Sequence, residues 1–421
     1  MTRLGVWRET RRVGTLDTMP NHDVRFTYDP EVATDRRPDD AVGLQCPVRA
    51  QPYVGRDALA IFENLLPEGA LRDTLGQATK HDASDTVGIL GVVGGECAGA
   101  LQLWPDGMEP PRHAAYDELS EPNLRAAFSV ADGQLRQVTG RASLSGAQAK
   151  LALLRLPPVG GEAPRYSLPR NGSPTTVVVK RPSEQFRGLL EAELVGMRLM
   201  RATGVPTASS VRCRVAPTCH ESARFDRAVL DSGAVVRHHA EDGCQLTGRT
   251  SRQKYASQGA PTYQELVAVL DRWSVDPLTD REFLFQWAVA NAALGNYDAH
   301  AKNVGVVYVS ADRVRLAPAY DVVVTAIFDG LDQNLALNFG GTNVPRGLTK
   351  GSLAKATREF RLTLPRATEL ADQVVSRIRE SLVSVLHEVA RDDGAPDMLD
   401  RLDASVRSTT HQVASRLQLS T

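Results

Sequence analysis

The feature that most constrains the fold of this 421-residue chain is a polar loop, Asn-Tyr-Asp-Ala-His-Ala-Lys-Asn, at residues 296–303. Before the loop, residues 279–282 (Thr-Asp-Arg-Glu) have the pattern of a capping box, and apolar residues then recur at helical spacing. After it, residues 304–316 predict a β-hairpin, because β-branched and alternating residues flank a Ser-Ala-Asp turn. A hairpin returns the chain to its start, so we expect Asp321 to lie beside Asn303.

Three side chains of this segment have the chemistry that phosphoryl transfer requires. The reaction needs a carboxylate that orients and deprotonates the attacking hydroxyl, and oxygen ligands that hold Mg²⁺ against the phosphates. Asp298 suits the role of base, whereas Asn303 and Asp321 suit the role of metal ligands. The Asp-x-x-x-x-Asn spacing is also that of the protein-kinase catalytic loop. The competing interpretation is a polar surface turn, which the presence of all three residues disfavours.

A second polar stretch, Ser-Leu-Ser-Gly-Ala-Gln-Ala-Lys at residues 143–150, precedes an apolar run. Small residues permit a close backbone approach, successive amides bind phosphate oxygens, and Lys150 adds positive charge. A simple turn before a strand is the competing interpretation. The position of the stretch upstream of the 296–303 loop favours a phosphate-binding loop.

The β-branched run 175–180 predicts a strand that ends in Lys180, with Lys180 on the same face as Val178. A Lys in this place often lies at the surface with its stem over apolar groups. Kinases, however, use a strand Lys that binds ATP phosphates and pairs with a Glu on a helix. The helix predicted over residues 189–200 supplies Glu193 as the candidate partner, with Glu191 as an alternative.

Composition excludes few functions. The formal net charge is −1 and the sequence pI is about 6.8, so no global charge indicates binding to nucleic acid or to an anionic membrane. No apolar run approaches the ~18 residues of a membrane-spanning helix, and the first residues lack a signal-peptide core, so we expect a cytoplasmic protein. The five cysteines form no Cys-x-x-Cys pair, which predicts reduced, mostly buried thiols.

Other segments outline the organisation of the chain. Residues 1–106 form a first unit, which contains a helix predicted over residues 57–66 and a glycine-rich stretch at 88–101. That stretch lacks both Gly-x-Gly-x-x-Gly spacing and a Walker Lys, so we interpret it as tightly packed backbone. The Pro- and Gly-rich residues 157–174 predict a long loop, and two apolar stripes within 370–417 predict C-terminal helices.

Taken in order, these motifs resemble the HipA-type serine/threonine kinases, which are toxins of bacterial toxin–antitoxin pairs. The resemblance implies an α+β, two-lobed protein-kinase-like fold with an added N-terminal subdomain and a mostly helical C-terminal lobe. It implies the N-terminal subdomain at 1–106, an ATP-binding lobe with phosphate loop and hinge at 107–227, and the helical lobe with catalytic and metal-binding loops at 228–421. The matching residues span essentially the whole chain: 62–69, 91–101, 143–150, Lys180, 224–227, 239–245, 296–303, Tyr320 and Asp321.

The resemblance implies roles for individual residues in the binding of ATP and Mg²⁺. Asp298 is the implied catalytic base, and Asn303 and Asp321 are the implied Mg²⁺ ligands. The implied hinge has Ala223 and Phe225 meeting adenine through the backbone and Asp226 meeting ribose. The other implied nucleotide contacts are Gln148, Lys150, Lys180 and His300, although His300 and Lys302 also suit a role in shaping the loop.

The resemblance further implies that Ser143 is autophosphorylated, with Ser145 as a second candidate in the same loop. A dianionic phosphate on this loop would leave the nucleotide's phosphate site by repulsion and steric exclusion and silence the enzyme. Two residues depart from the family pattern. Ala223 stands where Glu is usual, and Ala240 stands where Gln is usual, and the second change is the one expected to weaken nucleotide affinity.

The implied function is that of an ATP- and Mg²⁺-dependent protein kinase that arrests growth. Its implied partners are a small DNA-binding, HipB-like antitoxin and a translation factor such as an aminoacyl-tRNA synthetase, with DNA contacted only indirectly through the antitoxin complex and no membrane. Two alternatives stay open. A small-molecule phosphotransferase also carries an Asp-x-x-x-x-Asn loop, although the Ser143 loop argues against it. A catalytically silent scaffold for antitoxin and operator DNA is disfavoured by the intact Asp298, Asn303 and Asp321.

Overall fold

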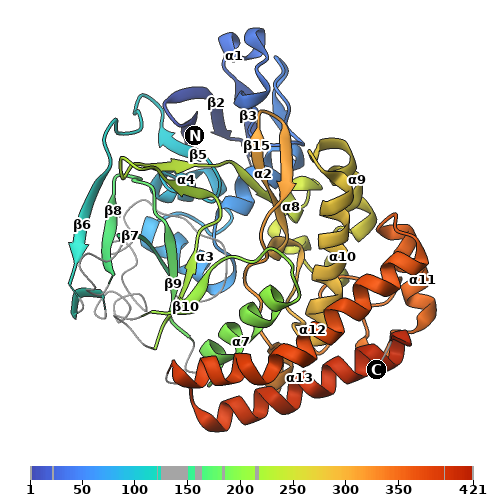
Figure 1. Ribbon diagram of the computed structural model, residues 1–421. Helices are drawn as coiled ribbons and strands as arrows, with labels where there is room; N and C mark the ends of the chain where they lie inside the picture. The colour runs from blue at the N-terminus through green and yellow to red at the C-terminus, as the bar shows by residue number, and fades with distance from the viewer. Residues whose placement is uncertain are drawn as a thin grey trace. The chain divides into compact units, whose positions relative to one another are not determined.

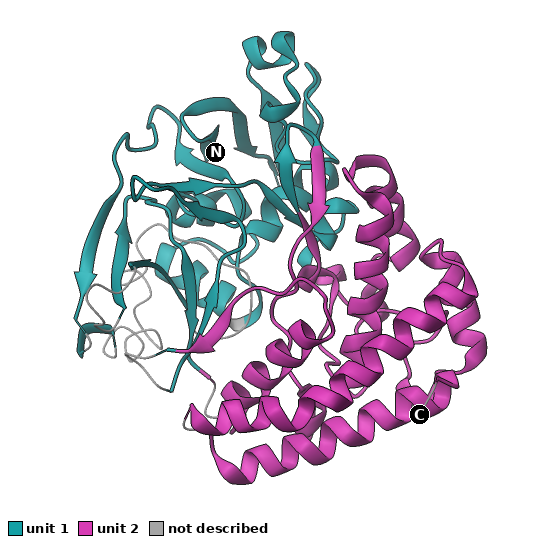
Figure 2. Cartoon of the chain, in the orientation of Figure 1, with its two compact units in different colours: residues 1–181, 213–251, 307–312 teal, residues 182–212, 252–306, 313–421 magenta. Residues whose placement is uncertain are grey.

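The computed structural model describes residues 2–20, 23–120, 122–124, 150–156, 164–182, 185–213, 218–392 and 394–419. The chain divides into two compact units, which Figure 2 shows in different colours. Unit 1 comprises residues 1–181, 213–251 and 307–312, and unit 2 comprises residues 182–212, 252–306 and 313–421. Each unit is therefore built from segments that lie far apart in the sequence.

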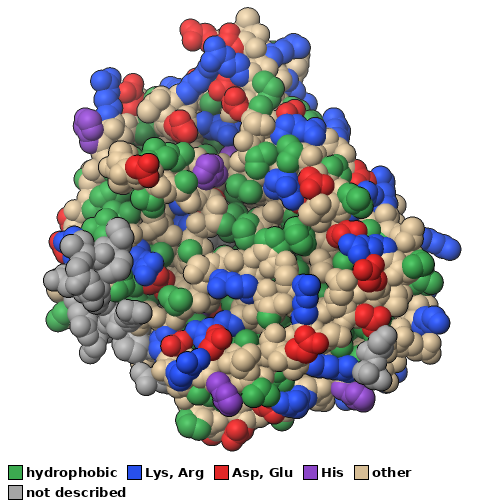
Figure 3. Space-filling model, in the orientation of Figure 1, with side chains coloured by type: hydrophobic (Ala, Val, Ile, Leu, Met, Phe, Trp, Pro, Cys, Tyr) green, Lys and Arg blue, Asp and Glu red, His purple; other side chains and the backbone are tan. Residues whose placement is uncertain are grey.

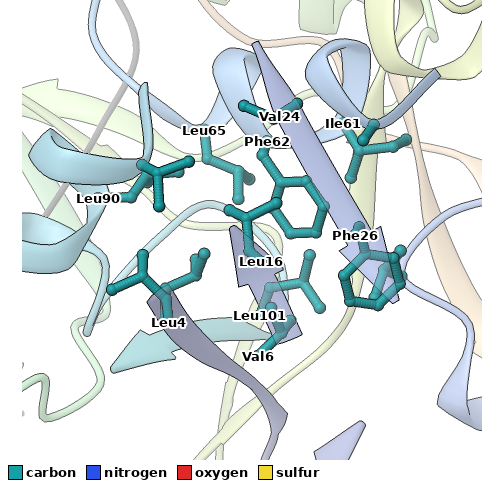
Figure 4. Packing of buried hydrophobic residues seen from close by; sticks show 14 of the residues in the cluster. Leu4, Val6, Leu16, Val24, Phe26, Ile61, Phe62, Leu65, Leu90 and Leu101 are labelled. Carbon is teal, nitrogen blue, oxygen red and sulfur yellow. The ribbon is translucent and has the colours of Figure 1, made fainter. Parts of the chain in front are cut away.

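The N-terminal part of unit 1 is an antiparallel sheet with the strand order β4-β3-β2-β1-β5. Alternate residues of these strands, such as Leu4, Val6, Leu16 and Phe26, are buried and pack with Phe62 of a covering helix (Figure 4). The elements are β1 (Arg3–Arg8), β2 (Arg11–Thr18), β3 (Val24–Tyr28), α1 (Pro30–Asp35), β4 (Tyr53–Val54), α2 (Arg56–Phe62), α3 (Gly69–Thr79), α4 (Thr86–Val93) and β5 (Leu101–Pro105).

The glycine-rich stretch is tightly packed, as predicted. It forms α4 and the approach to β5, and a Cβ on Gly94 would lie 2.5 Å from the carbonyl oxygen of Leu90 and 2.8 Å from the Cβ of Leu103. Real Cβ atoms do not approach that closely, so the position requires glycine. The helix predicted at 57–66 is present as α2, followed by a 3₁₀ turn at Glu63–Leu65.

A second antiparallel sheet in unit 1 has the strand order β11-β9-β7-β8-β6. Val177 and Val179 of β9 face its apolar core, so Lys180 lies on the opposite face with Val178, as predicted. The strands are β6 (Ala115–Leu119), β7 (Lys150–Leu156), β8 (Arg165–Arg170), β9 (Val177–Lys180) and β11 (His220–Ala223), and the unit also contains β12 (Arg227–Val229), β13 (Val235–Arg237), β14 (Ala240–Asp242) and α8 (Gly243–Leu246).

The prediction of a long loop over residues 157–174 is wrong for its second half, which forms β8. Tyr166 and Leu168 alternate in this strand and are buried, and β8 pairs with both β6 and β7. The Pro and Gly residues of the segment obscured this alternation, because Pro169 lies inside the strand.

Unit 2 is mainly helical, and α12 and α13 run along each other as two long helices (Figure 1). Both predicted C-terminal stripes are buried, for example at Val374 and Ile378 of α12 and at Leu402 and Val406 of α13. The elements are α7 (Leu189–Ala202), β10 (Ser210–Arg212), α9 (Tyr263–Trp273), α10 (Pro277–Leu294), β15 (Gly305–Ser310, whose first two residues belong to this unit), β16 (Arg313–Leu316), α11 (Lys350–Glu359), α12 (Leu364–Arg391) and α13 (Pro396–Leu417).

The helix before the polar loop begins earlier than predicted. α10 starts at Pro277, and the side chain of Asp276 caps it by accepting from the backbone N–H of Thr279 at 3.3 Å. The prediction of a capping box at residues 279–282 is therefore wrong, because Pro at the first helical position and Asp before it are the stronger signals for the start of a helix. Asp280 instead accepts from Ser274 Oγ at 2.6 Å and from the backbone N–H of Leu316 at 3.1 Å. These bonds fix α10 to the strand that leads toward Asp321.

The surface and the thiols agree with the composition. On the face shown in Figure 3, Lys and Arg side chains are intermixed with Asp and Glu side chains. All five cysteines are free and buried, as predicted. Within the described ranges, no helix combines the length and the apolar character needed to cross a membrane.

Candidate active site

The polar loop at residues 296–303 is held at the C-terminal end of α10 by buried hydrogen bonds. Gly295 ends the helix with a φ of +69°, a conformation that glycine adopts without strain. Asn296 then donates its side-chain amide to Asn291 Oδ1 of α10 at 2.7 Å, and the backbone N–H of Tyr297 donates to Thr325 Oγ1 at 2.8 Å. The base of the loop is thus fixed before the chain reaches Asp298.

Asn303 brings the three predicted catalytic and metal-binding residues together. Its Nδ2 donates at 3.4 Å to the backbone carbonyl of Asp298 and at 3.4 Å to that of Asp321. Because the amide nitrogen faces these carbonyls, Oδ1 is the atom that Asn303 presents as a ligand. Asn303 is buried, Asp298 is exposed, and Asp321 is half-buried. The sequence prediction that Asp321 returns beside Asn303 agrees with this geometry.

The oxygen atoms of Asn303 and Asp321 fit a magnesium ion. Mg²⁺ prefers hard oxygen ligands and commonly takes one or two from the protein, with waters and substrate phosphates completing the shell. Asp321 has a φ of +57°, a left-handed conformation that Asp and Asn adopt more readily than most residues. In the part of the chain that the structure describes, no cluster of three or more His, Cys, Asp or Glu side chains could hold a metal ion. Two oxygen ligands from the protein suit a metal that is shared with a phosphate.

His300 lies inside the loop, where it is buried. Burial, together with the positive charge of Lys254, lowers the pKa of His300 to about 3, so its imidazole is neutral near pH 7. Its ring packs edge-on against Tyr255, with centroids 5.3 Å apart.

Tyr255 is a site residue that sequence reasoning missed. Its hydroxyl donates to Asp298 Oδ1 at 2.5 Å. The two residues are 43 positions apart, and Tyr255 lies in no recognisable motif, so no local signal links them. The residue became evident only from the folded contact.

In unit 1, two predicted phosphate contacts lie next to each other. Lys150 of β7 is directly opposite Lys180 of β9, and His220 of β11 is opposite Lys180 on the other side. Residues paired in this way have side chains on the same face of the sheet. The structure therefore brings Lys150 and Lys180 together, as a phosphate-binding role requires.

The predicted hinge is fixed by a buried cluster of charges, which we call the Glu96 cluster: Glu96, Arg224, Asp226, Arg227 and Arg237. Glu96 is fully buried and is bound by Arg224 at 2.9 Å, by Arg227 at 3.0 Å and by Arg237 at 3.0 Å. Although burial by itself raises the pKa of Glu96, the guanidiniums of Arg227, Arg224 and Arg237 hold it below the usual value. The cluster joins the N-terminal sheet region to the hinge strand within unit 1.

Asp226 is part of the Glu96 cluster and is buried. Its carboxylate forms ion pairs with Arg224 at 2.7 Å and with Arg227 at 2.9 Å, and it accepts a hydrogen bond from the backbone N–H of Gly99 at 2.7 Å. Despite its burial, the two guanidiniums lower the pKa of Asp226 well below its usual value. Ala223 and Phe225, the implied adenine contacts, are only half-buried.

The remaining predicted residues have mixed outcomes. Ser143, Ser145 and Gln148 lie outside the described residues. Glu193 of α7 is 2% exposed and belongs to unit 2, whereas Lys180 belongs to unit 1, so their ion pair stays a prediction. Glu191 is bound by Arg212 at 2.9 Å within unit 2.

Comparisons with known proteins agree on one family. Residues 4–104 match the HipA N-terminal domain, and residues 142–382 match the HipA-like C-terminal domain. A Sinorhizobium fredii protein named "Putative kinase Y4mE" is 30% identical over 404 residues, which cover 92% of each chain. The serine/threonine-protein kinase toxin HipA of Shewanella oneidensis is 24% identical over 347 residues, which cover 77% of this chain and 76% of that protein.

A solved structure supports the fold. HipA in a complex of HipA, HipB and operator DNA from Shewanella oneidensis MR-1 aligns with a TM-score of 0.81 at 18% identity, covering 99% of this chain and 98% of that one. The protein therefore has the α+β, kinase-like fold that the sequence predicted. With both domain families matched, the chain belongs to the HipA family.

Proposed function

We propose that this protein is an ATP- and Mg²⁺-dependent serine/threonine protein kinase of the toxin type. The observation that carries the proposal is the pair of hydrogen bonds from the Asn303 amide to the carbonyls of Asp298 and Asp321. These bonds support the proposal, because kinases use a base and two metal ligands that lie close together in the same way.

In the proposed reaction, the carboxylate of Asp298 accepts a hydrogen bond from the acceptor Ser or Thr and takes its proton as the γ-phosphoryl group is transferred. Asn303 Oδ1 and the carboxylate of Asp321 would hold Mg²⁺, which when bound would neutralise charge on the ATP phosphates. Lys150 and Lys180 bind the phosphates from the sheet of unit 1. Two ammonium groups directly opposite each other can both bind one polyphosphate.

The proposed nucleotide site contains further residues that the family resemblance indicates. The backbone of Ala223 and Phe225 would meet adenine, and both residues are half-buried and flank Arg224 of the Glu96 cluster in the sequence. Asp226 would meet ribose while it also holds Arg224 and Arg227. Gln148 and His300 are the other proposed nucleotide contacts, and Glu193 is the proposed partner of Lys180.

Regulation by autophosphorylation is proposed at Ser143, with Ser145 as the second candidate. A phosphate on either residue would compete with the phosphates of ATP for Lys150 and Lys180. The same resemblance supports the division into an N-terminal subdomain at 1–106, an ATP-binding lobe at 107–227 and a helical lobe at 228–421.

The proposed partners follow from the relatives. The Shewanella oneidensis relative is named a serine/threonine-protein kinase toxin, and its solved structure contains HipB and operator DNA. We propose that this chain likewise binds a small HipB-like antitoxin in the cytoplasm and contacts DNA only through that complex. Its proposed protein substrate is a translation factor such as an aminoacyl-tRNA synthetase.

Metal-dependent nucleotide binding tests this proposal against the scaffold alternative. Calorimetric titration of the full chain with ATP should give tight binding in Mg²⁺ and much weaker binding after chelation with EDTA. A protein that binds no nucleotide under either condition would contradict the kinase proposal. Transfer of labelled γ-phosphate to protein, and not to choline or an aminoglycoside, distinguishes it from a small-molecule phosphotransferase.

A further inference from the structure

The contact between Tyr255 and Asp298 points to a role for Tyr255 in catalysis. The proposed base, Asp298, is exposed, and an exposed Asp side chain samples several rotamers. A general base acts only from a position within hydrogen-bond reach of the proton it removes. A hydrogen bond from a neighbouring group would restrict the carboxylate, and Tyr255 donates one to its Oδ1 at 2.5 Å.

Tyr255 is itself held by the backbone on both sides. The carbonyl of Lys254 accepts from the backbone N–H of Ala301, a member of the 296–303 loop, at 3.1 Å. On the other side, the backbone N–H of Ala256 donates to the carbonyl of Ala336 at 2.7 Å. The segment that carries the phenol is thus attached directly to the loop that carries the base.

The ring of Tyr255 is also packed. His300 lies edge-on to it with centroids 5.3 Å apart, and the ammonium group of Lys254 lies 5.1 Å from its centroid. A phenol fixed by its backbone and by its ring directs its hydroxyl to one place, which here is Asp298 Oδ1. All of these groups belong to unit 2, so the arrangement is complete within one unit.

We propose that Tyr255 is a positioning residue that holds the carboxylate of Asp298 in the orientation a base requires. The inference rests on the proposed kinase function. A hydrogen bond to Oδ1 fixes the plane of the carboxylate, and the second oxygen then has a defined position from which to accept the proton of the acceptor hydroxyl. Tyr255 does not touch the reacting atoms in this account and acts only through Asp298.

A double-mutant cycle tests the inference. The rate of ADP formation from Mg·ATP is measured for the full-length wild type, Tyr255→Phe, Asp298→Asn and the double variant. Tyr255→Phe should lower kcat about 10- to 100-fold with little change in KM for ATP, because the base is misplaced while nucleotide binding is untouched. In the Asp298→Asn background, the same substitution should cause no further loss, because it acts through the removed carboxylate.

The matched control is Tyr263→Phe, which deletes a hydroxyl from a buried tyrosine of the same unit. The ring of Tyr263 packs against Phe339 and Phe360 and lies outside the proposed machinery, so this variant should keep its kcat. Melting temperatures of all variants show whether a loss of rate is a loss of fold.

The outcomes distinguish a failure of the inference about Tyr255 from a failure of the proposed kinase function. If Tyr255→Phe keeps the wild-type kcat while Asp298→Asn loses it, the inference is overturned and the proposed function stands. Additive losses in the double variant, or a Tyr255→Phe loss that follows a lowered melting temperature, would also overturn the inference. If Asp298→Asn turns over ATP like the wild type, the proposed function fails, and the inference fails with it.

Discussion

Lys150 and Lys180 lie directly opposite each other in the antiparallel pair of β7 and β9. Two positive charges on the same face of the sheet favour the binding of a polyphosphate. We predict that Lys180→Gln, and separately Lys150→Gln, weakens Mg·ATP binding about tenfold or more, since each removes a charged hydrogen bond worth about 1.5–3 kcal/mol. Calorimetric titration measures the loss, with the exposed Lys355→Gln as the control that should bind normally. Normal affinity in both lysine variants would contradict a phosphate-binding role.

At Asp321, two substitutions distinguish the effect of the carboxylate from the effect of the left-handed backbone conformation. Because its φ is +57°, Asp321→Asn keeps a residue that tolerates the left-handed region, whereas Asp321→Ala adds strain of roughly 1 kcal/mol. We predict that Asp321→Asn melts near the wild-type temperature and yet loses the additional stabilisation that Mg²⁺ gives in the presence of ATP. Thermal melts with and without Mg·ATP measure both effects. Full Mg²⁺-dependent stabilisation of Asp321→Asn would exclude this carboxylate as a ligand.

The Glu96 cluster should contribute strongly to stability. Glu96→Gln removes the carboxylate that Arg224, Arg227 and Arg237 share. Because Arg224 and Arg227 keep Asp226 as a partner, the loss should be at most the ~3–5 kcal/mol that breaking a buried ion pair costs. Urea denaturation should show this drop in the free energy of unfolding. The matched control is Asp117→Asn, which breaks an exposed ion pair with Arg170 and should cost less than about 1 kcal/mol. Equal effects of the two substitutions would show that the cluster is not a stabilising element.

Glu241 should make stability depend on pH. Burial raises its pKa to about 7, although hydrogen bonds from Tyr308 and from the backbone N–H of Leu44 act in the opposite direction. Asp242 adds to the increase, whereas Arg8 opposes it.

The folded protein therefore holds a proton that the unfolded chain releases near pH 4.5. Binding of this proton adds to the free energy of unfolding. The contribution is fully present below that pH and is lost as the pH rises toward 7, by about 2 kcal/mol between pH 5 and pH 8. Glu241→Gln keeps the acceptor oxygen and removes the titration. The difference in unfolding free energy between the wild type and this variant should therefore shrink or change sign across that interval. Parallel pH curves for the two proteins would refute the prediction.

Local patterns in the sequence were sufficient for the elements that position the loop. The hairpin after residue 303 and the helix at 189–200 are present, as β15 with β16 and as α7. These elements follow from alternation and helical spacing, which each segment carries by itself. The start of α10 was misplaced because Asp276 and Pro277 outcompeted a second plausible cap, and β8 was missed because Pro169 suggested a loop.

The contacts that complete the site are not local and left no signal in the sequence. Tyr255 and Asp298 are 43 residues apart, and Glu96 and Arg224 are 128 residues apart. Tyr255 belongs to no motif, and Glu96 lies in the glycine-rich stretch but has no sequence neighbour that indicates its buried arginine partners. The family resemblance implies a hinge at Ala223, Phe225 and Asp226, but it does not indicate the buried ion pairs of Asp226.

Phosphate transfer with Asp298 as the base is the proposal on which the other predictions about the site depend. The most direct test is the intact mass of the purified wild type and of Asp298→Asn before and after incubation with Mg²⁺ and ATP, with the modified residues mapped by peptide sequencing. We predict added phosphate on Ser143 or Ser145 in the wild type and none in Asp298→Asn. A wild type that carries no phosphate at any time, or an Asp298→Asn variant phosphorylated as fully as the wild type, would contradict the claim.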